Sequence, residues 1–278
     1  MKKIQFFGIL FLAIIFSSLQ GEVIHRSISG DSLSYREVCQ QAILEDTVFD
    51  QFRSITSYAS IVECGCGGDF VRYLERNATL NTLIHMTEFS ELDLYGNPAL
   101  FTIPGWGTFS STTLRYVLVA DHISRLFDLP SDYSVAEIGA GFGGQAFILS
   151  KLQPFRQYYI YDLPEAEKLI YKIHQNLNVF GVECLCLEQE LPLESVDLVI
   201  SNYALSECDR KTQFSYFERV ISKSKRGYMI FNDINSYDHL FRNELLILFD
   251  SYGIKPTIHP EPVCTYTGNF LITWGDKK

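Results

Sequence analysis

A run of glycines directly follows a short apolar stretch and one acidic residue. The acid is Glu137, and the glycines are Gly139, Gly141, Gly143 and Gly144. Glycine lets a backbone turn sharply and lets a ligand approach the main chain closely. The residues after the last glycine fit a helix, whose first turn has free N–H groups to offer. The segment therefore predicts a strand, a ligand-binding loop and a helix, in that order.

A second acid, Asp162, ends the next strand-like stretch. A carboxylate at that place accepts hydrogen bonds from the ribose hydroxyls of a nucleoside. Two patterns fit the glycines: G-x-G-x-x-G, typical of dinucleotide sites, and E-x-G-x-G-x-G, typical of S-adenosylmethionine sites. Glu137 favours S-adenosylmethionine, because its carboxylate suits the cationic amino group of methionine and would repel a pyrophosphate. A dinucleotide, or a structural turn without a ligand, is the alternative.

A second segment, residues 63–68, has a similar pattern of an acid followed by glycines. Its sequence is Glu63-Cys64-Gly65-Cys66-Gly67-Gly68. A helical segment follows, and Leu83–His85 could form a second strand. The strand–helix alternation then stops at a stretch rich in Pro and Gly (90–110), whereas it continues to the end of the chain after the first motif. We therefore expect the cofactor at 137–144 and not at 63–68.

S-adenosylmethionine donates its methyl group by an in-line displacement, and an acceptor that carries a proton needs a base. Candidate bases follow strand-like stretches, because ligands of open α/β sheets bind beyond the carboxyl ends of the strands. Glu207 follows the fourth stretch, Asp233 follows the fifth, and His239 comes slightly later. Structural alternatives exist: Asp233 also suits a cap or turn, and His239 also suits a solvated helix position.

The elements that must position these residues alternate along the second half of the chain. Strand-like runs are expected at 135–138, 157–161, 182–187, 196–201, 228–232, 254–259 and 269–274. Helices between most of them predict a parallel sheet that is covered on both faces. The last two runs have no long helix between them, which favours an antiparallel edge. The expected fold class is α/β, with a Rossmann-like domain over 131–278.

The preceding region, 22–130, is predicted to be mainly helical. Apolar residues recur at helical spacing over 32–52 and 114–127, and 90–110 is predicted to be a loop or lid. Residues 1–21 combine lysines, an apolar stretch over 4–19 and small or polar residues. This layout predicts a signal peptide or a membrane anchor, with possible membrane association through 4–19. A cytoplasmic apolar arm is the alternative.

Composition and charge exclude several classes of protein. The 278 residues are 47% hydrophobic and carry a formal net charge of −10, with a pI near 5.1. This mixture excludes a disordered chain, and so negative a surface argues against nucleic acid as a partner. The seven cysteines do not suit a disulfide framework. Their C-x-C pairs (64/66 and 184/186) lack the usual zinc spacing, so no metal site is predicted.

Several segments in a fixed order carry a resemblance to a known family. They read SYREVCQQA (34–42), VFDQFRS (48–54), SSTTLRY (110–116), EIGAGFGGQ (137–145), YDLP (161–164) and DLVISNYALSE (197–207). The chain resembles the sugar O-methyltransferase family of the class I S-adenosylmethionine-dependent methyltransferases, over roughly residues 32–275. Ser111 departs from the family pattern, which commonly has proline there. The resemblance implies the class I methyltransferase sheet.

By that resemblance, the glycine loop and the residues after the second and fourth strands would hold S-adenosylmethionine. The expected cofactor-binding residues are Glu137, Gly139, Ala140, Gly141, Gly143, Asp162, Leu163, Ser201 and Asn202. The acceptor would lie against Trp106, Arg115, Tyr116 and Tyr203. Aromatic faces suit a sugar, and Arg115 suits a carboxylate or hydroxyls. Buried core aromatics and a structural ion pair are the alternative interpretation of these four residues.

The resemblance implies an S-adenosylmethionine-dependent O-methyltransferase that acts on a hydroxyl of a sugar or related polyol. Its acceptor would be a small molecule or a glycan. An NAD-dependent oxidoreductase, and a non-catalytic, envelope-associated descendant of a methyltransferase, are the alternatives. An export signal conflicts with this cofactor, which is made in the cytoplasm. The first 21 residues and the glycine loop therefore predict different compartments.

Overall fold

A computed structural model describes residues 25–233, 237–263 and 265–276 of the chain. The predicted signal peptide or anchor (1–21), with its apolar stretch over 4–19, lies outside the described residues. Within the described ranges, none of the helices combines the length and the apolar character that a bilayer crossing requires.

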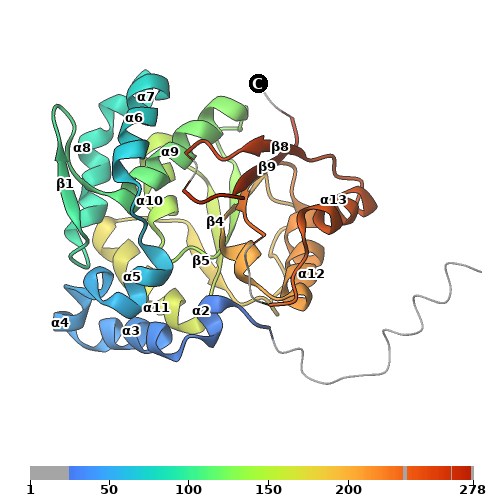
Figure 1. The fold of residues 1–278 in the computed structure, drawn as a ribbon, viewed down its shortest axis with the longest axis horizontal. Helices are drawn as coiled ribbons and strands as arrows, with labels where there is room; N and C mark the ends of the chain where they lie inside the picture. The colour runs from blue at the N-terminus through green and yellow to red at the C-terminus, as the bar shows by residue number, and fades with distance from the viewer. Residues whose placement is uncertain (1–24, 234–236, 264, 277–278) are drawn as a thin grey trace, which may run out of the picture.

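A seven-stranded sheet forms the centre of the C-terminal half (Figure 1). Its strand order is β5-β4-β3-β6-β7-β9-β8, and all neighbours are parallel except β9, which is antiparallel to β7 and β8. The strands are β3 (Ser134–Ile138), β4 (Gln157–Tyr161), β5 (Val182–Leu185), β6 (Leu198–Asn202), β7 (Gly227–Phe231), β8 (Thr257–Pro260) and β9 (Phe270–Trp274). The sheet confirms the predicted Rossmann-like fold class, including its antiparallel edge.

Helices cover both faces of this sheet. One face packs against α9 (Ser111–Leu126), α10 (Gly144–Leu152) and α11 (Pro164–Leu177), and the other against α12 (Arg210–Arg219) and α13 (Arg242–Ser251). Successive side chains of β3 point to opposite faces of the sheet: Val135 packs with α9–α11, and Ala136 packs with α12 and α13. All five residues of β3 are therefore buried; Val135, Ala136 and Ile138 are apolar, whereas Ser134 and Glu137 are not.

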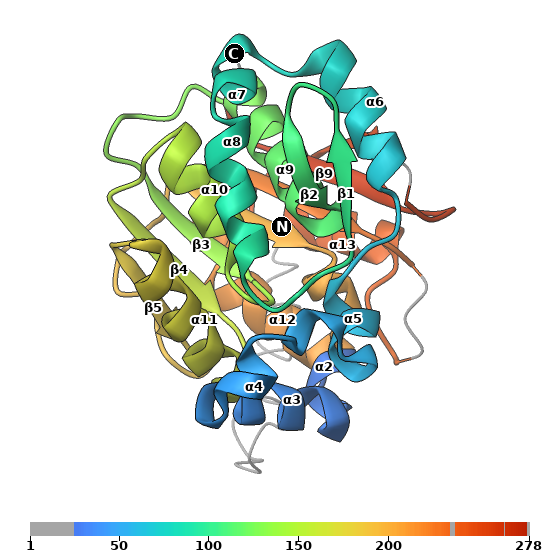
Figure 2. The same ribbon diagram turned by 90° about the vertical axis from the view of Figure 1, so that its left-hand side faces the viewer.

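The N-terminal region is mainly helical, as predicted, with one small hairpin. Its elements are α2 (Ile28–Asp31), α3 (Leu33–Leu44), α4 (Asp46–Phe49), η1 (Phe52–Ser54), α5 (Thr56–Val62), α6 (Gly67–Asn77), α7 (Leu80–Ile84), α8 (Met86–Phe89), η2 (Ser90–Leu94), β1 (Leu100–Ile103) and β2 (Gly107–Ser110). Figure 2 shows α3 beside α11, and the β1–β2 hairpin beside α9.

Two expectations for this region were wrong. The helix expected over 32–52 is broken, because Glu45 has an extended backbone (φ −126°, ψ 113°) that ends α3 and begins α4. The loop or lid expected over 90–110 contains the antiparallel pair β1–β2. Aromatic and β-branched residues favour the strands, and Gly105 (φ 83°) supplies the turn that Pro104 begins.

Candidate active site

The glycine loop joins β3 to α10, and its glycines take conformations that other residues rarely adopt. Gly139, Gly141 and Gly143 have φ values of 71°, 61° and 82°. A Cβ on Gly139 would lie 2.1 Å from the Cβ of Ala204, in the loop after β6. The close approach of these two loops therefore requires glycine, which explains the first position of the sequence pattern.

Asp162 holds this loop from the neighbouring strand β4. Its carboxylate accepts hydrogen bonds from the backbone N–H groups of Ala140 at 2.7 Å, Gly141 at 3.2 Å and Leu163 at 2.8 Å. Burial raises the pKa of Asp162 to about 6, and the three backbone donors oppose that rise. A carboxylate has about four acceptor positions, so one is left for a ligand hydroxyl.

Two adjoining cavities lie at the carboxyl ends of the central strands. The first, of about 150 Å³, extends from Gly139 and Asp162 to the segment after β5 and to α12. The second, of about 80 Å³, extends from the same residues to α9 and to the loop after β6. Ser29 and Ala204 also line both cavities. The cavities thus adjoin at the glycine loop, and we call them the two branches of one cleft.

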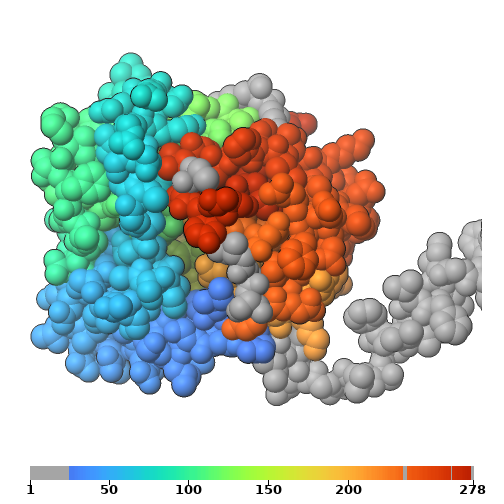
Figure 3. Space-filling model, viewed as in Figure 1, coloured from blue at the N-terminus to red at the C-terminus, as the bar shows by residue number. Residues whose placement is uncertain are grey.

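The start of the described chain forms a wall of the first cavity, a role that the sequence did not predict. Residues 25–27 and Ser29 line the cavity. The carbonyl oxygen of Arg26 accepts from the backbone N–H of Asp209 at 2.9 Å, and the backbone N–H of Arg26 donates to Thr212 Oγ1 at 3.0 Å. In the space-filling view this blue segment lies against the orange C-terminal half (Figure 3). We call residues 25–31 the N-terminal strap.

The other predicted cofactor residues surround the cleft at different depths. Leu163 lines the first cavity, and Ala140, Gly141 and Asn202 line the second. The Nδ2 atom of Asn202 donates to Gln145 at 3.3 Å, whereas its Oδ1 atom is buried without a partner. Ser201 lines neither cavity. Its hydroxyl donates to the carbonyl oxygen of Ile138 and accepts from the backbone N–H of Leu205, which fixes the turn after β6.

Glu137 lies beneath the loop and lines neither cavity. Its carboxylate is buried among the α9–α11 side of the core and accepts a hydrogen bond from the Tyr158 hydroxyl at 2.9 Å. Burial raises the pKa of Glu137 to about 8. The carboxyl group is therefore mostly protonated at pH 7 in the ligand-free protein. Its predicted contact with the methionine ammonium stays a prediction.

That predicted role of Glu137 has a measurable signature. An ammonium group beside the carboxyl favours its ionised form, so the pKa falls and a proton is released on binding. Calorimetric titration of S-adenosylhomocysteine at pH 7, in buffers of different ionisation enthalpy, should show the release of close to one proton from Glu137. The Glu137→Gln variant should release correspondingly less. Equal proton release by both proteins would contradict the contact.

Glu207 is the predicted base that the structure brings to the cleft. It ends the 3₁₀ helix η3 (Ala204–Glu207) and lines the second cavity beside the glycine loop. Burial raises the pKa of Glu207 to about 7, and the charge of Arg115 opposes the rise. A carboxylate that titrates near neutral pH is well matched to accept a proton during a reaction.

The other two base candidates line neither cavity. Asp233 Oδ1 accepts the backbone N–H of Arg242 at 3.2 Å, at the first residue of α13. His239 is buried, and its Nδ1 atom lies 2.9 Å from the carbonyl oxygen of Tyr237. The contact of Asp233 matches its structural alternative, a cap or turn, whereas the solvated helix position that was the alternative for His239 is wrong.

Three of the four predicted acceptor residues gather at the second cavity. The partly buried guanidinium of Arg115 lies 5.4 Å from the ring centre of Tyr116 and 5.5 Å from that of Tyr203. Tyr203 has a left-handed backbone (φ 73°), and its hydroxyl bonds with Glu261 and Thr265. Trp106 lies in the turn of the β1–β2 hairpin, packs against the core, and lines neither cavity.

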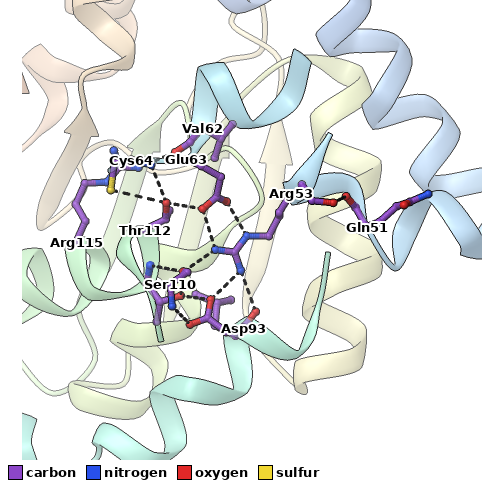
Figure 4. Close-up of polar contacts among 12 residues, drawn as sticks. Gln51, Arg53, Val62, Glu63, Cys64, Asp93, Ser110, Thr112 and Arg115 are labelled. Atoms are coloured by element: carbon purple, nitrogen blue, oxygen red, sulfur yellow. Dashed lines mark hydrogen bonds and ion pairs between the residues drawn. The ribbon is translucent and has the colours of Figure 1, made fainter. Parts of the chain in front are cut away.

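A buried polar network explains why the sequence before Arg115 is rich in hydroxyl groups (Figure 4). Asp93 accepts from the backbone N–H of Ser110 and from Thr113 Oγ1, each at 2.7 Å. Thr112 Oγ1 donates to Glu63 at 2.7 Å, and Arg53 links the two acids. The network fixes the first turn of α9, so the position of Arg115 one turn later is also fixed.

The same network shows what residues 63–68 do. Glu63 follows helix α5 and not a strand, and its carboxylate pairs with Arg53 at 2.6 Å. The later stretch 83–85 belongs to α7 and its end, and forms no strand. This segment is therefore not a strand–loop–helix motif, as expected. Among the described residues, no group of three or more His, Cys, Asp or Glu side chains is arranged to hold a metal.

No family model and no curated protein matches the chain. Solved structures are similar to it in fold. A SAM-dependent methyltransferase from Aquifex aeolicus is 19% identical over 51% of this chain and 81% of its own, with a TM-score of 0.39. An O-methyltransferase family protein from Burkholderia thailandensis is 12% identical over 58% of this chain, with a TM-score of 0.44. This chain spans 55% of that protein's length.

TrmK from M. capricolum, solved with the natural cofactor product S-adenosyl-homocysteine, is 13% identical over 58% of this chain and 67% of its own, with a TM-score of 0.41. At these identities the likeness concerns the fold alone. The chemistry therefore has to be argued from the cleft itself.

Proposed function

We propose that this protein is an S-adenosylmethionine-dependent O-methyltransferase that acts on a hydroxyl of a sugar or related polyol. The observation that carries the proposal is the two-branched cleft at the glycine loop. Asp162 faces both branches, and Glu207, a carboxylate with a pKa of about 7, faces the second. A nucleoside-binding acid and a proton acceptor thus line the same cleft beside one loop.

The residues of the cleft suit a nucleoside that carries a methionine tail. Gly139 lines both branches of the cleft without a side chain that would obstruct a ligand, and Asp162 has acceptor capacity for a ribose hydroxyl. In the second branch, Asn202 Oδ1 and Arg115 Nε are buried without partners. An ammonium group is a donor for the amide oxygen, and a carboxylate is an acceptor for the guanidinium. A methionine tail offers both groups.

The residues of the second branch would act mainly by positioning and by proton transfer. Bound S-adenosylmethionine supplies an electrophilic methyl group on a sulfonium, which leaves as a neutral thioether. Glu207 in its ionised form takes the hydroxyl proton of the acceptor as the new O–C bond forms, while the electrons of the breaking S–C bond stay on sulfur. The walls of the cavity would hold the acceptor oxygen in line with the methyl group.

The acceptor class rests on the sequence resemblance and on the rings of this branch. Tyr116 and Tyr203 present aromatic surface to the second cavity, next to the Glu207 carboxylate and the Arg115 guanidinium. Such a combination of apolar faces with a few polar groups is suited to the C–H faces and hydroxyls of a sugar.

Calorimetric titration of the full chain with S-adenosylhomocysteine and with NAD⁺ tests the cofactor. We expect binding of S-adenosylhomocysteine alone, and weaker binding by Asp162→Asn. Transfer of a labelled methyl group from S-adenosylmethionine to a panel of hexoses, deoxyhexoses and inositols then tests the acceptor. Binding of NAD⁺ in place of S-adenosylhomocysteine would establish the oxidoreductase alternative. Cofactor binding without transfer to any member of the panel would reject the sugar acceptor.

A further inference from the structure

Arg115 is a partly buried cation, and the described part of the protein supplies no ion-pair partner for it. Its side chain lines the second cavity, and the one hydrogen bond that it makes within the described residues runs from Nη2 to the carbonyl oxygen of Val62 at 3.3 Å. The Nε atom is buried and has no partner among these residues. Arg53, which is fully buried, instead pairs with Glu63 and Asp93.

Such an arrangement is unfavourable for the ligand-free protein. Removing a guanidinium from water without a paired carboxylate is costly, and stacking between two tyrosine rings offsets only part of that cost. Two acids share its cavity. Glu207 is only partly ionised near neutral pH, because burial raises its pKa to about 7, and Asp162 already accepts three backbone N–H groups. Glu63, which is also nearby, is committed to Arg53 and Thr112. Arg115 is therefore held ready for an anion that comes from outside.

The protein maintains Arg115 in this position through the first turn of α9. Ser110 caps the helix, and Asp93 and Glu63 fix the hydroxyl groups of Thr113 and Thr112. The rings of Tyr116 and Tyr203 then flank the guanidinium. A pre-positioned guanidinium offers paired N–H donors that match the two oxygens of a carboxylate.

We propose that Arg115 binds a carboxylate group of a ligand in the second cavity. The proposal rests on the proposed function, which supplies two sources of that group. One is the methionine tail of the cofactor, and the other is an acidic sugar acceptor of the uronate type. In either case the carboxylate pairs with the guanidinium and supplies the missing acceptor for its buried donors.

Calorimetric titration of the wild type, Arg115→Met and Arg115→Lys with two nucleosides tests the first source. S-adenosylhomocysteine carries the carboxylate, and 5′-methylthioadenosine lacks the whole amino-acid tail. We expect Arg115→Met to weaken S-adenosylhomocysteine binding by about 10- to 100-fold and to leave 5′-methylthioadenosine binding unchanged. The affinity of Arg115→Lys for S-adenosylhomocysteine should lie between those of the wild type and Arg115→Met, since lysine keeps the charge but lacks the paired N–H donors of a guanidinium.

The second source is tested with D-glucuronate against D-glucose, by saturation-transfer NMR, with and without S-adenosylhomocysteine. Preferential binding of glucuronate by the wild type and its loss in Arg115→Met assign the carboxylate to the acceptor. If the variant changes neither nucleoside binding nor glucuronate binding, the proposal is overturned. If the wild type binds neither nucleoside, the proposed function fails; the carboxylate proposal fails with it only if glucuronate does not bind either.

Thermal unfolding of the ligand-free protein separates this role from a structural one. Arg115→Met removes an unpaired, partly buried charge, so its Tm should equal or exceed that of the wild type. Arg125→Met is the matched control on the same helix: Arg125 pairs with the buried Asp121 at 2.9 Å, so its Tm should fall. A clear fall for Arg115→Met as well would show that Arg115 is a structural residue.

Discussion

Glu207→Gln is expected to lower the rate of methyl transfer by about 10²- to 10⁴-fold, the usual contribution of a positioned base. The amide has nearly the same shape as the carboxylate but cannot accept the hydroxyl proton. Binding of S-adenosylhomocysteine should change little, because the first branch of the cleft and Asp162 are untouched. The measurement is labelled methyl transfer to the acceptor that the wild type accepts.

The pH dependence of the reaction tests the same role of Glu207, because the direction of the change can be predicted. Only the ionised form of Glu207 is active, and burial raises its pKa to about 7. The kcat/KM of the wild type should therefore fall as the pH drops below about 7, with one proton bound. Glu207→Gln should lose this acid limb, whereas Glu218→Gln, on the exposed face of α12, should keep both rate and profile. An unchanged rate in Glu207→Gln would show that the base is another group.

Arg53→Met is expected to destabilise the protein by about 3–5 kcal/mol, because it leaves buried carboxylates without their cation. Arg53 is fully buried and pairs with Glu63 at 2.6 Å and Asp93 at 2.9 Å. Its guanidinium also lies 4.4 Å from the ring centre of Phe142, within the glycine loop. The same change should therefore weaken S-adenosylhomocysteine binding as well as lower the free energy of unfolding.

Equilibrium urea unfolding followed by circular dichroism measures the first effect, and calorimetric titration measures the second. Arg76→Met, at the exposed end of α6, is the control and should stay within about 0.5 kcal/mol of the wild type. A small effect of Arg53→Met on unfolding would mean that the two acids are neutralised in another way.

Local patterns predicted the sheet and the glycine loop well. Strands that are buried on both faces leave continuous apolar runs, and a loop that must approach Ala204 closely requires glycine at Gly139. Asp162 could be located because it ends a strand beside that loop, and parallel neighbours end at the same edge. The rejection of residues 63–68 also followed from local order, since no strand–helix alternation continues beyond them.

Features that depend on distant contacts could not be predicted in this way. The N-terminal strap lines the first cavity through contacts with Asp209 and Thr212, which are far away in sequence. Tryptophan is a residue type on which a ligand can stack, but Trp106 lies in the turn of the β1–β2 hairpin and lines neither cavity. Arg115 was placed near the acceptor, yet its lack of an ion-pair partner is visible only in three dimensions.

The N-terminal strap also bears on how the protein would mature. Cleavage of the predicted signal peptide after Gly21 would leave only Glu22, Val23 and Ile24 ahead of His25, which lines the first cavity. The new amino group, together with the Glu22 carboxylate, would then be within three residues of the lining of the proposed entrance for the nucleoside. A purification tag fused at that end would crowd the same entrance, whereas a tag after the last residue would follow β9, which contributes nothing to the lining of either cavity.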